Sequence, residues 1–194
     1  RHIEAVSNHL ILYSEADYEA AQAKIALGTC ILEAWIPSEK VVSLSVVRNE
    51  RGELLVYPPF EQVQSSAVSG TQVRYPVKLH EEVEREIRRL GRYLVETLAL
   101  VSCMTIDFLV TSAGVVYINS VEIGAKDAAM FTLGAMSLSC YEAMVRAVVG
   151  LPLPSLVPLA DAAIALPLEA LNAEQVMTQY MLRTDWGFAL FNPM

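Results

Sequence analysis

Residues 41–57, VVSLSVVRNERGELLVY, contain the pattern that decides the fold. The first eight positions are rich in valine, a β-branched residue that favours strands. A polar segment, residues 49–52, ends in glycine as a tight turn requires, and a second apolar run follows it over residues 53–57. Two prolines at positions 58 and 59 end this run. The segment therefore predicts an antiparallel hairpin.

The segments on either side of this hairpin alternate between helical and extended patterns. Residues 81–100 give the clearest helix, because Val83, Ile87, Leu90 and Leu94 follow the helical period. The other expected elements are helices over 15–26 and 130–149, a second hairpin over 102–110 and 115–118, strands over 9–13, 30–36 and 185–191, and an irregular polar segment over 61–75. This order predicts an α+β fold with largely antiparallel sheets.

The composition limits the classes of partner. The chain has 194 residues, of which 54% are hydrophobic, yet no apolar run reaches the roughly 20 residues that a membrane helix needs. The surplus of apolar surface is therefore expected to be buried either within the fold or against a partner. The formal net charge of −8 gives no support to binding of free nucleic acid.

The cysteines and the first residue carry two further expectations. Cys30, Cys103 and Cys140 have no metal-binding spacing and lie in apolar stretches, so buried reduced thiols are expected. The chain begins with Arg1, which favours a processed product or a fragment.

Four segments, in this order and spacing, resemble a known family of enzymes. They are CILEAWIP (30–37), VSLSVVR (42–48), IDFLVT (106–111) and RAVVGLPL (146–153). Together they resemble the N5-carboxyaminoimidazole ribonucleotide synthetases of the ATP-grasp family. The resemblance implies an incomplete ATP-grasp fold: a lid-like lobe over residues 1–58, a central lobe over 59–160, and the start of a small C-terminal domain over 161–194. The family's N-terminal substrate domain is expected to be absent.

The resemblance also implies a nucleotide site, but several of the family's site residues are replaced. The glycine-rich phosphate loop falls on residues 4–9, which contain no glycine. Val41 stands where the family places a glutamate for the ribose hydroxyls. Of the two acidic side chains that hold Mg²⁺ in the family, the first falls on Asp107 and the second on Ser120, a poor ligand for this ion.

The candidate site therefore consists of remnants of a nucleotide or phosphate site: Glu33, Trp35, Arg48, Asp107, Asn119 and Lys126. Arg48 points either towards the old phosphate pocket or to the surface at a strand end. Lys126 stands where the family has histidine and is either a phosphate ligand or a solvated loop residue. Glu122 and Asp127 either re-form a metal site near Asp107, with Asp107 and Glu122 as the rebuilt pair, or are solvated loop carboxylates. No catalytic residue, bound metal or cofactor is expected.

These replacements favour a pseudoenzyme that acts as a structural subunit of a larger assembly. The most specific hypothesis is a guide-RNA-associated subunit of a mitochondrial RNA-editing complex, because the chain resembles the remodelled ATP-grasp proteins of kinetoplastids. Its partners would be proteins, including a paralogous ATP-grasp subunit, with RNA bound through the assembly and no membrane. The location would be mitochondrial, or otherwise cytoplasmic. The alternatives are a divergent ATP-dependent carboxyaminoimidazole ribonucleotide synthetase of purine biosynthesis and an ATP-binding regulatory module.

Overall fold

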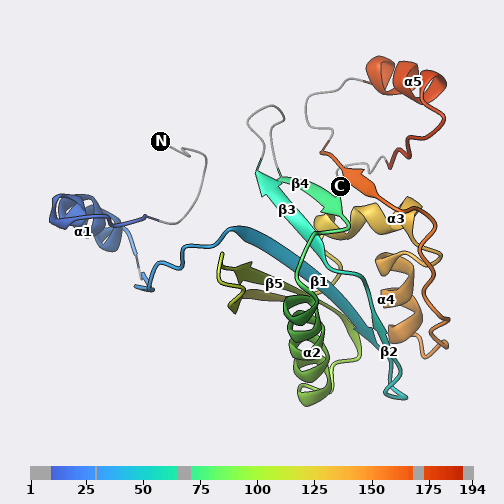
Figure 1. The fold of residues 1–194 in the computed structure, drawn as a ribbon, viewed down its shortest axis with the longest axis horizontal. Helices are drawn as coiled ribbons and strands as arrows, with labels where there is room; N and C mark the ends of the chain where they lie inside the picture. The colour runs from blue at the N-terminus through green and yellow to red at the C-terminus, as the bar shows by residue number, and fades with distance from the viewer. Residues whose placement is uncertain (1–9, 29, 65–70, 168–172, 190–194) are drawn as a thin grey trace. The chain divides into compact units, whose positions relative to one another are not determined.

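The computed structural model describes residues 10–28, 30–64, 71–167 and 173–189 (Figure 1). The chain divides into two compact units, residues 1–37 and 38–194. The first unit contains a short 3-10 helix, η1 (Glu15–Asp17), followed by α1 (Tyr18–Ala26). The Asp17 carboxylate accepts hydrogen bonds from the backbone N–H groups of Tyr13 (2.8 Å) and Ser14 (2.9 Å), which lower the pKa of Asp17.

The second unit is built on one antiparallel sheet. Its strands run in the order β6-β5-β1-β3-β4-β7, and β2 pairs with the free end of β1. The strands are β1 (Lys40–Arg48), β2 (Leu54–Val56), β3 (Phe60–Gln64), β4 (Thr71–Tyr75), β5 (Ser102–Val110), β6 (Val116–Ile123) and β7 (Ala163–Ala165). The central pair, β1 and β5, is in register over all nine residues, from Lys40 opposite Val110 to Arg48 opposite Ser102.

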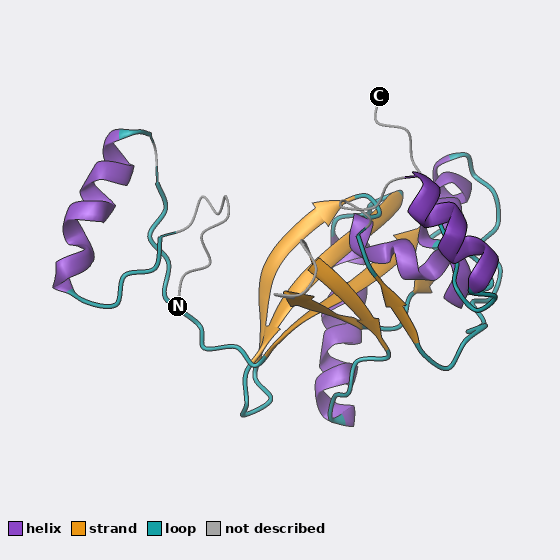
Figure 2. Cartoon of the chain, turned by 90° about the horizontal axis from the view of Figure 1, so that it is seen from above, coloured by secondary structure: helices purple, strands orange, loops and turns teal. Residues whose placement is uncertain are grey.

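Helices cover both faces of this sheet (Figure 2). On one face α2 (Glu81–Thr97) packs through Val83, Ile87 and Val95. On the other face lies a second core, which includes residues of a 3-10 helix, η2 (Asp127–Phe131), and of α3 (Thr132–Ala135) and α4 (Cys140–Val148). The last helix, α5, spans Ala173–Leu182. Within the described ranges, no helix is both long enough and apolar enough to cross a membrane.

Both predicted hairpins and the helices expected over 15–26 and 81–100 are confirmed, the latter ending at Thr97. The irregular segment expected over 61–75 was wrong, because β3 and β4 occupy most of it. The strands expected over 9–13, 30–36 and 185–191 were also wrong, since their described parts, residues 10–13, 30–36 and 185–189, contain no strand. The expected lobes at 1–58, 59–160 and 161–194 stay a prediction, and the sheet takes strands from all three.

The helix expected over 130–149 is interrupted. Met136 is extended, with φ −127° and ψ 150°, and forms a β-bridge with Pro158. A new helix, α4, begins at Cys140 after Ser139, whose side chain accepts a hydrogen bond from the Glu142 N–H at 3.1 Å. A long-range backbone contact therefore breaks a locally favourable helix.

The three cysteines fall into two environments. Cys103 on β5 and Cys140 at the start of α4 are fully buried, with their sulfur atoms 3.3 Å apart. Their hydrogen bond and the burial raise the pKa of Cys103 far above its ordinary value. Cys30 in the first unit is exposed, so the expectation of burial was wrong for this residue.

Gly91 sets how closely α2 approaches β1. A Cβ atom at this position would collide with the buried side chain of Leu44 and lie 3.2 Å from Cγ2 of Val46. We expect Gly91→Ala to lower the free energy of unfolding, because overpacking typically costs about 1–3 kcal/mol, whereas alanine adds about 1 kcal/mol of helix propensity. Gly91→Val should cost more. Urea denaturation measures both variants.

Gly134→Ala is the matched control for this prediction. Among the described residues, apart from the glycine's own neighbours and helix backbone, no heavy atom lies within 4 Å of a Cβ placed at Gly134, so this substitution should leave stability unchanged or slightly higher. A Gly91→Ala protein as stable as the Gly134→Ala protein would contradict the close packing of α2 on β1.

Candidate functional site

The two faces of the β1–β5 pair differ in polarity because side chains alternate along a strand. Val42, Leu44 and Val46 of β1 belong to the core beneath α2. On the opposite face, the paired residues change from apolar to polar along the strands: Val47 with Cys103, Ser45 with Thr105, and Ser43 with Asp107. The apolar end joins the core that contains α4 residues. The polar end forms the candidate site.

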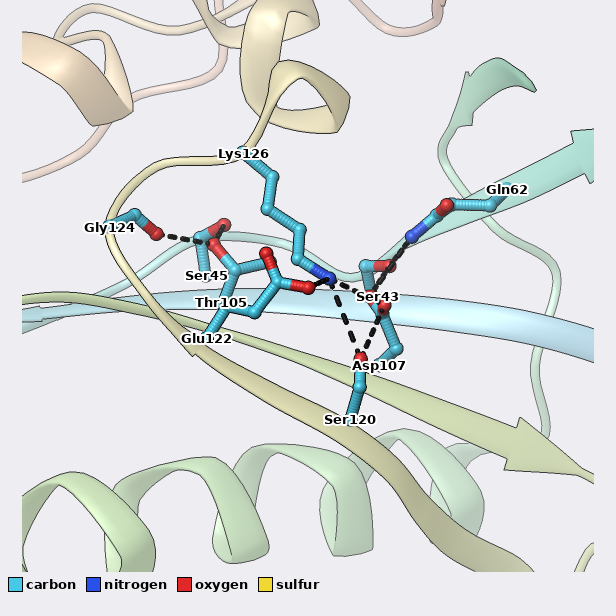
Figure 3. Close-up of polar contacts among 9 residues, drawn as sticks. All are labelled: Ser43, Ser45, Gln62, Thr105, Asp107, Ser120, Glu122, Gly124 and Lys126. Carbon is cyan, nitrogen blue, oxygen red and sulfur yellow. Dashed lines mark hydrogen bonds and ion pairs between the residues drawn. The ribbon is translucent and has the colours of Figure 1, made fainter. Parts of the chain in front are cut away.

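Asp107 lies at the centre of the site and is 7% exposed (Figure 3). Its Oδ1 accepts hydrogen bonds from Ser43 Oγ at 2.6 Å and Gln62 Nε2 at 2.9 Å. Its Oδ2 accepts hydrogen bonds from Ser120 Oγ at 2.9 Å and Lys126 Nζ at 2.8 Å. A carboxylate offers about four lone-pair positions. Four donors from four segments of the chain therefore use its full accepting capacity.

Lys126 connects Asp107 to a second carboxylate. Its ammonium lies 2.8 Å from Asp107 Oδ2 and 2.7 Å from Glu122 Oε1, and its side chain is 19% exposed. Burial disfavours the charged form of Lys126, but the hydrogen bonds to Asp107 and Glu122 outweigh that effect and raise its pKa. The ammonium is therefore a permanent charge at neutral pH. We call the group of Ser43, Gln62, Asp107, Ser120, Glu122 and Lys126 the Asp107 cluster.

The loop that carries Lys126 is anchored to the sheet and to α4. Gly124 has a φ of +119°, a conformation that favours glycine, and its N–H donates to the Cys103 carbonyl at 2.8 Å. The Gly124 carbonyl accepts a hydrogen bond from Thr105 Oγ1 at 3.0 Å, as Figure 3 shows. On the far side, the Tyr141 hydroxyl donates to the Lys126 carbonyl at 2.8 Å. These contacts fix the backbone from which the lysine reaches Asp107.

The structure brings together only part of the predicted set. Asp107 and Lys126 are in direct contact, whereas Arg48 lies five residues along β1 from Ser43, or about 17 Å at the usual strand rise. Arg48 is also on the face that α2 covers, where it donates to the Leu100 carbonyl at 3.4 Å. Asn119 is exposed on β6 beside the β-bulge opposite Asp107 and Phe108.

Glu33 and Trp35 belong to the first unit, and both are exposed there, Trp35 to 66%. Residues that the sequence did not single out complete the site in the second unit. The serines at positions 43 and 45, which interrupt an apolar strand, were the available signal for Ser43. No comparable signal pointed to Gln62 as a site residue, because the segment around it was expected to be irregular.

The residues present do not fit the Mg²⁺ ion that the resemblance implies. Ser120, directly opposite Asp107, donates a hydrogen bond to it and adds no negative charge. Glu122 is paired with Lys126, and Asp127 is exposed at the start of η2. Among the described residues, no three histidine, cysteine, aspartate or glutamate side chains are grouped closely enough to hold a metal ion.

Comparisons with known proteins agree on one family. Residues 8–141 match the family model described as an ATP-grasp domain. The N5-carboxyaminoimidazole ribonucleotide synthase of Bacillus subtilis is 28% identical over 143 residues, which are 74% of this chain and 37% of that protein.

Among solved structures, the ADP complex of an N5-carboxyaminoimidazole ribonucleotide synthetase is similar at 27% identity, with a TM-score of 0.79, over 88% of this chain and 45% of that one. The ADP complex of the Staphylococcus aureus N5-carboxyaminoimidazole synthetase has a TM-score of 0.77 over 92% of this chain and 48% of that one. At 18% identity, this second likeness supports the fold alone. The chain thus spans less than half the length of each of these relatives.

The prediction of a protein without catalytic activity was wrong. The Bacillus subtilis relative and the similar structure at 27% identity are a synthase and a synthetase, which are enzymes. None of the three proteins named above is described as an RNA-editing protein or a scaffold, so they give no support to the guide-RNA hypothesis. The replaced motif residues misled the prediction, because their combined loss was weighed without the contacts that the fold supplies.

The Asp107–Lys126 pair should stabilise the second unit. Removing one partner of a buried ion pair costs about 3–5 kcal/mol, but Asp107 keeps three other donors here, so we expect Lys126→Met to lower the free energy of unfolding by about 1–3 kcal/mol. Urea denaturation is the measurement, because urea does not screen charges. Lys78→Met, at an exposed lysine, is the control with the same change in charge. Equal stability of the two variants would contradict a stabilising pair.

Proposed function

Because this chain belongs to the ATP-grasp family, we propose that it is the nucleotide-binding part of an ATP-dependent synthetase that carboxylates an aminoimidazole ribonucleotide. The observation that carries this proposal is that sequence and fold point to the same enzyme. The relative from Bacillus subtilis and the ADP-bound structure are both synthetases of N5-carboxyaminoimidazole ribonucleotide. A chance likeness in sequence would not be expected to coincide with a TM-score of 0.79 over most of the chain.

The polar end of the β1–β5 pair supports the nucleotide-binding part of the proposal. ATP brings a concentrated negative charge, which a protein must offset with cations and with hydrogen-bond donors. Lys126 supplies an ammonium with three donor hydrogens at the surface of the sheet. Its position is fixed before any ligand binds, because Asp107 holds its side chain and Tyr141 holds its backbone. A preorganised charge of this kind loses little conformational entropy on binding.

Glu122 sets the balance of charge in this site. With Asp107 and Glu122 both ionised against one lysine, the Asp107 cluster carries a net charge of −1. The Glu122 side chain is 57% exposed, so it can turn into solvent at little cost. Asp107 and Lys126 then form a neutral pair, and the Lys126 ammonium can donate a hydrogen bond to another acceptor. In this proposal, phosphate takes the place of Glu122 at the ammonium.

The proposal predicts that the intact natural protein releases ADP from ATP only when 5-aminoimidazole ribonucleotide and bicarbonate are both present. Bicarbonate is the expected carboxyl donor, because it must lose one oxygen to carboxylate the amine, and transfer of a phosphoryl group from ATP lets that oxygen leave as inorganic phosphate alongside ADP. A coupled assay of ADP release measures the turnover. Lys126→Met should lower kcat/KM by about 10²-fold or more, because a charge placed against the phosphates is lost.

Glu96→Gln, at an exposed position of α2, is the control and should turn over like the natural protein. ADP release that does not depend on the ribonucleotide would contradict the substrate assignment. Absence of ATP binding in a folded protein would contradict the proposal as a whole.

A further inference from the structure

The Asp107 cluster disagrees with the divalent metal that an ATP-grasp fold implies, and the contacts of Asp107 give the reason. Mg²⁺ requires oxygen ligands at about 2.0–2.1 Å in a nearly octahedral arrangement. Both oxygens of Asp107 already accept two hydrogen bonds each, at distances between 2.6 and 2.9 Å. A metal ion could bind only after displacing donors that come from β1, β3, β6 and the loop before η2.

We propose that the Lys126 ammonium occupies the cation position on Asp107, so that phosphates are bound here by this protein charge and not by a metal ion held by Asp107. The proposal rests on the proposed function for its ligand, a nucleotide polyphosphate. The assignment of Lys126 itself rests on geometry alone: the ammonium lies between two carboxylates, 2.8 Å from Asp107 and 2.7 Å from Glu122.

Two features keep the Lys126 ammonium at this position on Asp107. Its backbone is held at both ends of a short loop, by the Gly124 contacts with Cys103 and Thr105 and by the Tyr141 hydroxyl. The residue opposite Asp107 on β6 is Ser120, so a metal ion would have to displace the lysine from both Asp107 and the largely exposed Glu122, and would find a neutral hydroxyl where a second buried acid would lie. The lysine therefore takes the position of the metal ion on Asp107. Its own charge makes an acid at position 120 unnecessary.

Glu122 then has a regulatory part that differs from that of Asp107. Asp107 is buried and fixes the lysine, whereas Glu122 is largely exposed and competes with an incoming phosphate for the same ammonium. Neutralising Glu122 should strengthen binding of a polyphosphate. Neutralising Asp107 should weaken it, because the ammonium loses its anchor.

The first experiment tests Lys126 without any nucleotide. Free Mn²⁺, followed by electron paramagnetic resonance, is titrated into the natural protein, Lys126→Met and the double variant Lys126→Met with Ser120→Glu. We expect no binding that depends on Asp107 in the natural protein. The single variant should gain measurable binding, and the double variant should bind Mn²⁺ at least about tenfold more tightly than the single one, because affinity rises with the number of charged ligands.

Lys78→Met is the control for the change in net charge and should behave like the natural protein. Circular dichroism confirms that each variant is folded. Binding of Mn²⁺ to the natural protein that disappears in Asp107→Asn would overturn the proposal, because Asp107 would then be a metal ligand despite the lysine.

The second experiment measures ATP binding by calorimetry in the presence of Mg²⁺ and again in the presence of EDTA. We expect the natural protein to bind ATP with the same Kd in both conditions. Lys126→Met should raise the Kd by about tenfold or more, and Glu122→Gln should lower it. Binding that is lost in EDTA would overturn the proposal. If the natural protein binds no ATP at all, the proposed function fails, whereas the Mn²⁺ titration still decides the assignment of Lys126.

Discussion

The nine-residue antiparallel register between β1 and β5 is the constraint on which the rest of the second unit depends. Leu44 and Ile106 must face α2, because they belong to the hydrophobic core between the sheet and this helix. Their chain neighbours Ser43 and Asp107 must then face the opposite side of the sheet. A slip of one residue would bury the carboxylate under α2 and expose the apolar row. The hydrophobic packing of one face therefore positions the polar group of the other.

The same constraint explains what the sequence could predict. The hairpin at 41–57 and the helix at 81–97 follow from local patterns, since strand alternation and the helical period are properties of neighbouring residues. β3 and β4 escaped prediction because their side chains are mostly half-exposed polar groups, such as Gln62 and Gln72, without a clear apolar alternation. The interruption before α4 depends on Pro158, more than twenty residues from Met136, and no local pattern reports it.

The candidate site shows the same division between local and distant information. Asp107 and Lys126 entered the candidate set through a family resemblance, but their mutual contact spans 19 residues, and the contact of Asp107 with Ser43 spans 64. A sequence read position by position records a lost carboxylate at Ser120 and a lost histidine at Lys126 as two independent defects. In the fold, these two residues contact the same carboxylate oxygen, so they form one combined replacement.

The distribution of the cysteines has a practical consequence for studying the two units. Cys103 and Cys140 are buried against each other in the sheet unit, and the strongly raised pKa of Cys103 makes that thiol slow to react with alkylating reagents. Cys30 is exposed in the first unit. Among these three cysteines, a maleimide fluorophore will therefore modify Cys30 first, which gives a selective label for spectroscopy of the first unit.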